Sequence, residues 1–392
     1  MLLIRAVQNI GIAAPPSVRS KSILSSLRSS RVLISSSDDI YTNLAIEHWL
    51  YTNLKFSTRA KQADFDSPVV FLWVNSPCVV IGKHQNPWQE STLGFVERAG
   101  IKLARRFSGG GCVYHDENNI NISVIGNREI FSRRQDNLRL LSKFLKDKYA
   151  IECEPSLRHD LKHVETGLKM SGSAARLGSQ NSYHHFTLLV DSDKEVLSTA
   201  IRRKDQDFIH SNSTSSVRSD VINLSELKNG ISTETVLNDL AQEYGKIYRV
   251  PIVGKNDIEF AEASCREDSE SIASIINKLK DWEWIYGQTP QFKLERSITV
   301  SEKGVDKEVK FIVQINKGRF EKFIIEGETI KDNPAEKFNH LIGVKFNYKE
   351  SVPVIAKMFN SNNEIPHSST ESIGSERVFA TLLLQMIHGA NY

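Results

Sequence analysis

The chain has 392 residues, of which 40% are hydrophobic and 25% are charged, and its formal net charge is +3. This length favours two domains over one, and no apolar run approaches the roughly 20 residues that cross a bilayer. A nearly neutral chain also lacks the basic character on which nucleic-acid binding depends. We therefore expect neither a membrane nor a nucleic-acid partner.

The first 31 residues differ in composition from the rest of the chain. Seven of them are serine and five are arginine or lysine, whereas the first acidic residue is Asp38. Basic, serine-rich and acid-free segments are typical of mitochondrial and chloroplast transit peptides. We expect residues 1–31 to be a transit peptide, with a disordered tail of no further function as the alternative.

Apolar runs in the first third of the chain predict short strands at 31–35, 69–74, 78–82 and 101–105. The turn at Asn75–Pro77 separates the second and third of these strands, which predicts a β-hairpin. Ser37–Asp39 can cap a helix that ends near Leu54, and a shorter helix is expected at 90–99.

The middle of the chain continues the alternation of strands and helices. Residues 119–124 alternate polar and apolar side chains, which predicts a half-buried strand. Apolar residues at helical spacing predict helices over 134–149 and 233–248, and 183–190 is expected to be a strand. This order of elements predicts an α/β (α+β) fold.

The pattern changes after a predicted linker at 253–257. The aromatic segment 282–292 is expected to form a strand and a turn, and 310–315 and 319–325 an antiparallel pair. The chain is expected to end in a helix at 376–387. These elements predict a smaller C-terminal α+β domain.

The cysteines are widely separated, at Cys78, Cys112, Cys153 and Cys265, and no two have CxxC spacing. This spacing predicts neither a zinc site nor a redox pair, so we expect no metal. It fits reduced thiols in an intracellular compartment. Cys112 follows three glycines and could act as a nucleophile, but packing of a small residue is the favoured interpretation.

The most informative segment is Arg105–Asp116, in which two arginines lead into three consecutive glycines. Glycines allow the backbone to approach a ligand closely, and successive free N–H groups can form a nest for an anion. Arginines add charge and bidentate geometry for phosphate or carboxylate. The segment predicts a site for a phosphate-bearing small molecule, with a glycine-rich hairpin and solvated arginines as the alternative.

Lys169 is the second informative cation, because it lies among small residues between Gly167 and Gly172. A lysine held near a phosphate or an acyl carbonyl stabilises the charge that develops in acyl transfer. The alternative is a solvated lysine. His184 and His185 have no cysteine or acidic pair at metal spacing, so they are expected to be polar pocket or strand-entry residues.

Five segments in the same order resemble motifs of the lipoate–protein ligase A family. They are Ile81–Trp88, Arg105–Asp116, Lys169–Ala174, Tyr183–Leu189 and Trp282–Phe292. The resemblance implies a large catalytic domain at 32–255, with a mixed sheet and a fold shared with biotin ligases, and a small accessory domain at 256–392. With the N-terminal segment, the chain is most similar to the animal mitochondrial lipoyltransferases of the family.

The resemblance implies an acyltransferase of the mitochondrial matrix. Such an enzyme passes an activated lipoyl (or octanoyl) group to a lysine ε-amine on lipoyl domains of 2-oxoacid dehydrogenase E2 subunits. The implied donor is lipoyl-AMP, or lipoate carried on the glycine-cleavage H protein, with no permanently bound cofactor. We expect a monomer.

Motif matching implies one catalytic residue, Lys169, which would bridge the phosphate and the acyl carbonyl of lipoyl-AMP. The other implied donor-binding residues are Arg106, Ser108, Gly109, Gly110, Gly111, Cys112, Val113, Tyr114, Arg158, Thr187, Val217 and Ser219. Two departures from the motifs, Lys83 for arginine and Asn118 for glycine, are expected to affect ligand affinity. No residue is singled out as a general base.

Three other functions stay open at this point. A full ligase would make its own lipoyl-AMP from ATP and lipoate, and the motifs do not separate it from a transferase. A non-catalytic lipoyl-binding scaffold is disfavoured by the intact Arg106, Lys169 and glycine loop. A biotin ligase is disfavoured because SGGG stands in place of its GRGRxGR loop. The basic patches Arg133–Arg134 and Arg202–Lys204 could guide docking of a lipoyl domain, with solvated charge as the alternative.

Overall fold

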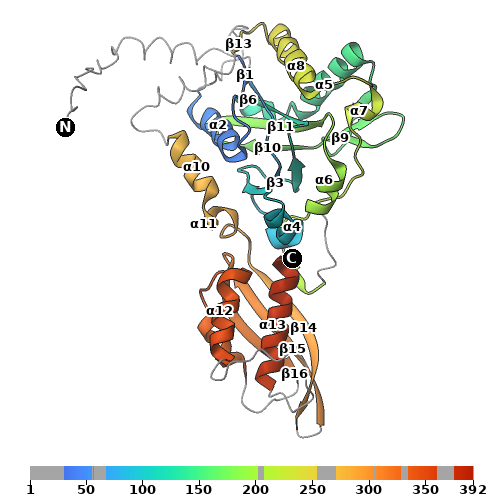
Figure 1. The fold of residues 1–392 in the computed structure, drawn as a ribbon. Coiled ribbons are helices and arrows are strands. Elements are labelled where there is room, and N and C mark those ends of the chain that lie inside the picture. The colour runs from blue at the N-terminus through green and yellow to red at the C-terminus, as the bar shows by residue number, and fades with distance from the viewer. Residues whose placement is uncertain are drawn as a thin grey trace, which may run out of the picture.

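The computed structural model describes residues 31–54, 56, 68–201, 207–253, 271–302, 305–327, 334–359 and 375–391. These residues form a larger lobe and a smaller C-terminal lobe (Figure 1). The expected transit segment up to residue 30, the patch Arg202–Lys204 and Cys265 lie outside the described residues. Among the described helices, none is long and apolar enough to cross a membrane.

A six-stranded mixed sheet forms the centre of the larger lobe. Its order is β10 (Ser173–Leu177), β11 (Asn181–Leu189), β6 (Asn119–Asn127), β2 (Val69–Trp73), β1 (Val32–Ile34) and β13 (Ile252–Val253). Strand β1 is parallel to β2 and β13, and the other neighbours are antiparallel. The mixed sheet and the α/β fold class expected from the sequence are confirmed.

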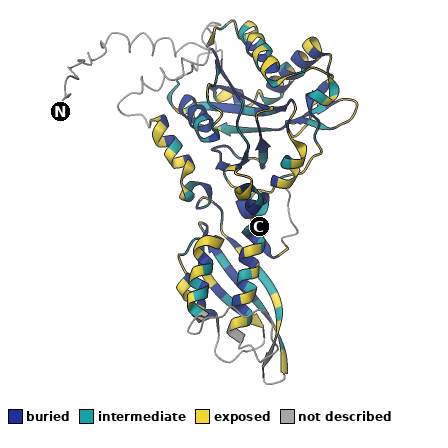
Figure 2. Cartoon of the chain, in the orientation of Figure 1, coloured by how far each residue is buried: buried dark blue, intermediate teal, exposed yellow. Residues whose placement is uncertain are grey.

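Helices cover both faces of this sheet. Successive side chains of a strand point to opposite faces, so one strand can contribute to both cores. Val70 and Leu72 of β2 share a core with α5 (Arg134–Tyr149) and α8 (Thr233–Tyr248), whose bounds agree with the prediction. Phe71 packs on the other face, with α2 (Ile40–Asn53) and α10 (Ile272–Lys280). The central strands β2 and β6 are buried along nearly their whole length (Figure 2).

Strand β6 is not half-buried as predicted, because both of its faces are buried. Its apolar side chains, such as Ile122, join the core formed with α5 and α8. Its polar side chains Asn119 and Asn121 line two cavities. The polar face of this strand therefore lines cavities, whereas the prediction placed that face in solvent.

The hairpin predicted from 69–74 and 78–82 is wrong. Strand β3 (Cys78–Ile81) lies in a second sheet, between β4 (Lys102–Arg105) and β5 (Val113–His115), whereas β2 lies between β1 and β6. The link between β2 and β3 contains the fully buried Asn75, whose side chain is hydrogen-bonded to Asn43 and His115. These buried polar contacts make the link a corner between two sheets.

A third sheet and several short helices complete the larger lobe. The sheet contains β7 (Cys153–Pro155), β8 (Leu161–His163) and β9 (Lys169–Ser171). The short helices are α3 (Pro87–Glu90), α4 (Leu93–Arg98), η1 (Arg128–Phe131), α6 (Lys194–Ala200) and α7 (Leu224–Leu227). The helix predicted at 90–99 is found as the shorter α4, and Glu90 is the last residue of α3.

The smaller lobe contains an antiparallel four-stranded sheet and helices, as expected for an α+β unit. The strands are β12 (Ile209–Ser211), β14 (Phe292–Glu302), β15 (Val305–Asn316) and β16 (Arg319–Gly327), in this order. The helices are η2 (Pro334–Leu341), α12 (Tyr348–Phe359) and α13 (Ser375–Asn391). The predicted pairing of 310–315 with 319–325 is confirmed.

The strand predicted at the start of 282–292 is wrong, because Trp282–Ile285 forms the short helix α11. The Asp281 carboxylate caps this helix by accepting a hydrogen bond from the N–H of Glu283. The domain division at 255 stays a prediction. Because α10 packs against α2 of the larger lobe, we propose that the smaller domain begins after α11.

Candidate active site

The side chain of Arg106 holds the glycine loop 108–111 in place. Its guanidinium donates hydrogen bonds to the carbonyl oxygens of Val80, Gly109 and Gly111 and to the Ser108 hydroxyl. Gly82 also packs against the loop, so closely that a Cβ there would lie 2.2 Å from the carbonyl oxygen of Gly110. Arg106 therefore shapes the loop, and its contact with a donor phosphate stays a prediction.

Arg105 points away from the loop and is fully buried. It donates hydrogen bonds to the carbonyl oxygens of Gly82, Lys83, Gln85, Trp284 and Ile285 and to the Thr289 hydroxyl. Burial lowers the pKa of Arg105 to about 9. The expectation that both arginines face the anion is therefore wrong for Arg105, which ties the larger lobe to the segment around α11.

A distant segment, residues 214–217, closes over the glycine loop. The Ser216 hydroxyl accepts a hydrogen bond from the Cys112 N–H at 2.8 Å and donates one to the Glu90 carboxylate. A Cβ on Gly111 would lie 3.1 Å from the same hydroxyl oxygen. Sequence analysis missed Ser216 and Glu90, because only the fold brings these residues, 126 positions apart, into contact.

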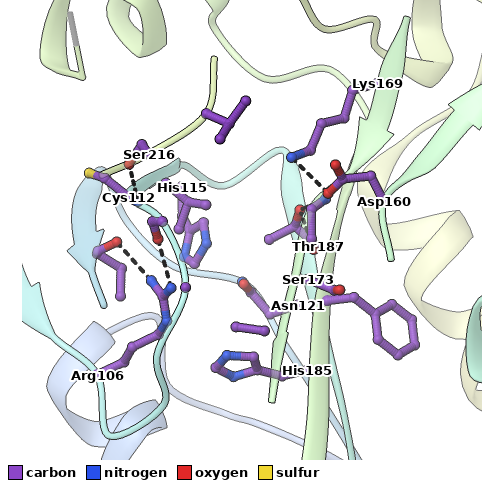
Figure 3. Close-up of a pocket in the computed structure, with 18 of the residues that line it drawn as sticks. Arg106, Cys112, His115, Asn121, Asp160, Lys169, Ser173, His185, Thr187 and Ser216 are labelled. Carbon is purple, nitrogen blue, oxygen red and sulfur yellow. Dashed lines mark hydrogen bonds and ion pairs between the residues drawn. The ribbon is translucent and has the colours of Figure 1, made fainter. Parts of the chain in front are cut away.

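Lys169 lies on β9, and its ammonium is 2.9 Å from the Asp160 carboxylate. Gly172 leaves room for this ammonium, since a Cβ there would lie 3.1 Å from Cε and 3.2 Å from Nζ of Lys169. The Gly172 N–H donates to the hydroxyl of Thr187 on β11 at 3.0 Å. Lys169, Gly172 and Thr187 form one wall of a cavity, and the Lys169 ammonium in it is paired with the Asp160 carboxylate (Figure 3).

Two cavities, of about 300 and 430 Å³, meet at this wall. Both are lined by Cys112, Val113, Lys169, Gly172, Thr187, Ser216 and Val217. The first cavity continues between Ile40, Leu44 and Trp73, and the second continues toward Leu189 and Leu197. Each volume suits half of an elongated small molecule, and the cation lies where the halves would join.

Two histidines, His115 and His185, line the first cavity (Figure 3). Burial lowers the pKa of His115 to about 3, so its ring is neutral. The Asn75 amide lies 3.1 Å from Nδ1 of His115, which places the proton on Nε2, an atom without a partner among the described residues. His185 contacts the Glu47 carboxylate at 2.9 Å and the Ser108 hydroxyl at 3.0 Å, and so connects the glycine loop to α2.

The second cavity is lined in part by Asn119, a polar residue that was not expected at the site from the sequence. The residue is fully buried, and neither its side-chain nitrogen nor its oxygen has a hydrogen-bond partner among the described residues. An unpaired buried amide is costly, so a ligand that pairs with it gains affinity.

Most of the expected donor-binding residues line these cavities. Gly110, Gly111, Arg106 and Arg158 line the first, Tyr114 and Ser219 the second, and Cys112, Val113, Lys169, Thr187 and Val217 both. Ser108 and Gly109 line neither cavity, and Ser108 is buried. Burial raises the pKa of the Cys112 thiol, which favours packing over a nucleophilic role. The binding roles stay predictions.

The contact between Gly172 and Lys169 leads to a testable expectation. In a Gly172→Ala variant, the methyl group would displace the ammonium by a few tenths of an ångström. Because small misplacements of catalytic groups have large effects, we expect the acyl-transfer activity that the motifs imply to fall about tenfold. Steady-state kinetics measures this, and an unchanged kcat would show that the ammonium position is not critical.

Comparison with known proteins gives consistent matches. The family model described as the lipoyl protein ligase A/B catalytic domain matches residues 39–245. The mitochondrial lipoyl amidotransferase LIPT1 of Homo sapiens is 36% identical over 319 residues, which cover 80% of this chain and 82% of that protein. A putative lipoate-protein ligase A of Schizosaccharomyces pombe is 31% identical, with 77% and 81% covered. The crystal structure of P. falciparum LipL1 in complex with lipoate shares the fold, with a TM-score of 0.53, 24% identity, and 91% of this chain and 99% of that chain covered.

Proposed function

Because this chain belongs to the lipoyl protein ligase A/B catalytic-domain family, we propose that it is a lipoyl amidotransferase of protein lipoylation. It transfers an activated lipoyl (or octanoyl) group to the ε-amine of a lysine on lipoyl domains of 2-oxoacid dehydrogenase E2 subunits. The observation that carries this proposal is the Lys169 ammonium at the junction of the two cavities.

Lipoyl-AMP has the shape and charge that the joined cavities require. Its aliphatic chain fits between Ile40, Leu44 and Trp73 in the first cavity, and its adenosine fits the second. The mixed anhydride then lies beside Lys169, in reach of both the phosphate and the acyl carbonyl. A fixed ammonium at this point stabilises the negative charge that develops on the carbonyl oxygen when an amine attacks.

The Asn119 amide is proposed to pair with the adenine. An amide matches the N6 and N7 edge of adenine with one acceptor and one donor. In an Asn119→Ala variant, we expect the affinity for lipoyl-AMP to fall on the order of tenfold, because a hydrogen bond of this kind contributes about 1–1.5 kcal/mol. Calorimetric titration checks this, and an unchanged Kd would place the adenine elsewhere.

The lipoyl donor that the protein uses distinguishes the proposed transferase from an ATP-dependent lipoate ligase, the alternative that the S. pombe relative's name suggests. Lipoyl-AMP, free lipoate with ATP, and lipoyl-H protein are compared as donors to one lipoyl domain, with mass spectrometry of the product. The proposal expects product from lipoyl-AMP and little or none from free lipoate with ATP. Efficient modification from lipoate and ATP would favour the ligase, and no product from any donor would contradict both.

We propose the mitochondrial matrix as the site of this reaction. Support comes from the composition of residues 1–31 and from the name of the human relative. The proposed partners are lipoyl domains and the glycine-cleavage H protein, with the enzyme acting as a monomer. Sequencing the N-terminus of the protein from purified mitochondria tests the localisation, since an intact Met1 would contradict cleavage of a transit peptide.

A further inference from the structure

Asp160 is a carboxylate in the wall of the first cavity that none of the motifs assigned. Its Oδ1 contacts Nζ of Lys169 at 2.9 Å, and its side chain is only 14% exposed. No hydrogen bond or ion pair involves its second oxygen in the described part of the chain. The carboxylate therefore has a free oxygen beside the place where the acyl carbonyl of the donor is proposed to lie.

The backbone on both sides of Asp160 is irregular. His159 has a φ of 60°, in the left-handed region that non-glycine residues rarely adopt, and the Ser156 hydroxyl accepts from the N–H of Asp160 at 3.2 Å. The pairing of β8 with β9 shifts register between Leu161 and Lys162. Strained residues and bulges of this kind persist where the fold directs a side chain into a functional site.

The transfer reaction requires a proton acceptor at this position. An acceptor lysine has a pKa of about 10.4 in water, so it arrives as an ammonium. Its nitrogen must lose two protons as it becomes an amide, the first of them before it can attack. Lys169 is a cation and cannot accept this proton. In Figure 3, His115 lies beside Cys112 and His185 lies toward Asn121, whereas Asp160 lies beside Lys169.

We propose that Asp160 is the general base of lipoyl transfer, an inference that rests on the proposed function. The electron pair of the neutral acceptor amine forms the C–N bond with the lipoyl carbonyl carbon. The bond from this carbon to the phosphate oxygen breaks, and AMP leaves with that electron pair. Before the attack, the acceptor ammonium passes one proton to the Asp160 carboxylate, which later releases it to water. The second proton leaves the nitrogen for water once the C–N bond has formed.

The test separates a base from a residue that only positions Lys169. An Asp160→Asn variant keeps the size and removes the basicity. Its transfer from lipoyl-AMP is measured with two nucleophiles, a lipoyl domain and hydroxylamine, each corrected for the reaction without enzyme. Hydroxylamine is already neutral at neutral pH and is far less dependent on a base. We expect transfer to lysine to slow on the order of 10²-fold, while hydroxamate formation and the affinity for lipoyl-AMP are retained.

The control is Glu154→Gln, which makes the same charge change at an exposed position of β7, the strand before Asp160. We expect this variant to behave as the wild type with both nucleophiles. If Asp160→Asn slows both nucleophiles equally, or slows neither, the base assignment is wrong. If the wild type transfers lipoate to neither nucleophile, the proposed function itself fails.

Discussion

Replacing Lys169 by alanine is expected to slow transfer of the lipoyl group from lipoyl-AMP by on the order of 10²–10³-fold. The ammonium lies where the two cavities meet, so its removal takes away the fixed charge at the carbonyl and the phosphate. Single-turnover kinetics with saturating lipoyl-AMP measures the chemical step apart from donor binding.

The matched control for this variant is Lys162→Ala. Lys162 lies directly opposite Lys169 in the β8–β9 register, but it lines neither cavity. Its loss is expected to leave the rate nearly unchanged. Equal rates for the wild type and the Lys169→Ala variant would show that Lys169 has no catalytic role.

Replacing Arg105 by methionine is expected to lower the free energy of unfolding on the order of 4 kcal/mol. The guanidinium is fully buried and binds five carbonyl oxygens and one hydroxyl from two separate segments. Methionine fills similar space but leaves four of the five carbonyl oxygens without their donor, since only that of Gly82 keeps a second one, the N–H of Gln85. Each buried unpaired group costs about 1–3 kcal/mol. Because one segment contains α11, the connection between the lobes is expected to loosen first.

Thermal unfolding compares this variant with Arg139→Met. Arg139 forms an exposed ion pair with Asp136 on α5, and exposed pairs contribute about 0–1 kcal/mol. We expect a clear fall in Tm for Arg105→Met and almost none for Arg139→Met. Equal Tm values for the two variants would mean that the buried network around Arg105 does not stabilise the fold.

Local patterns in the sequence predicted the elements whose structure is decided locally. Helices α5 and α8 begin and end where their apolar spacing and flanking residues indicate. The prediction of a hairpin at 69–82 was wrong because strand pairing depends on which other strands of the fold compete as neighbours. The prediction of a strand at the start of 282–292 was wrong. Its aromatic composition is typical of a strand, but the Asp281 side chain caps a short helix there.

The candidate site was predictable to a similar extent. The glycine loop, Arg106 and Lys169 belong to recognisable motifs, and the fold places Arg106, Lys169 and much of the loop at one pair of cavities. Glu90, Asn119, Asp160 and Ser216 were missed. Each is an ordinary polar residue in sequence and gains its significance only from burial or from contacts across the fold.

The most direct test of the account is a crystal structure of the protein with lipoyl-AMP or a non-hydrolysable sulfamate analogue. We expect the acyl chain between Ile40 and Trp73, the adenine beside Asn119, and Lys169 within hydrogen-bond distance of both the phosphoryl group and the acyl carbonyl. A donor bound outside the two cavities, or with its phosphoryl group away from Lys169, would contradict the account.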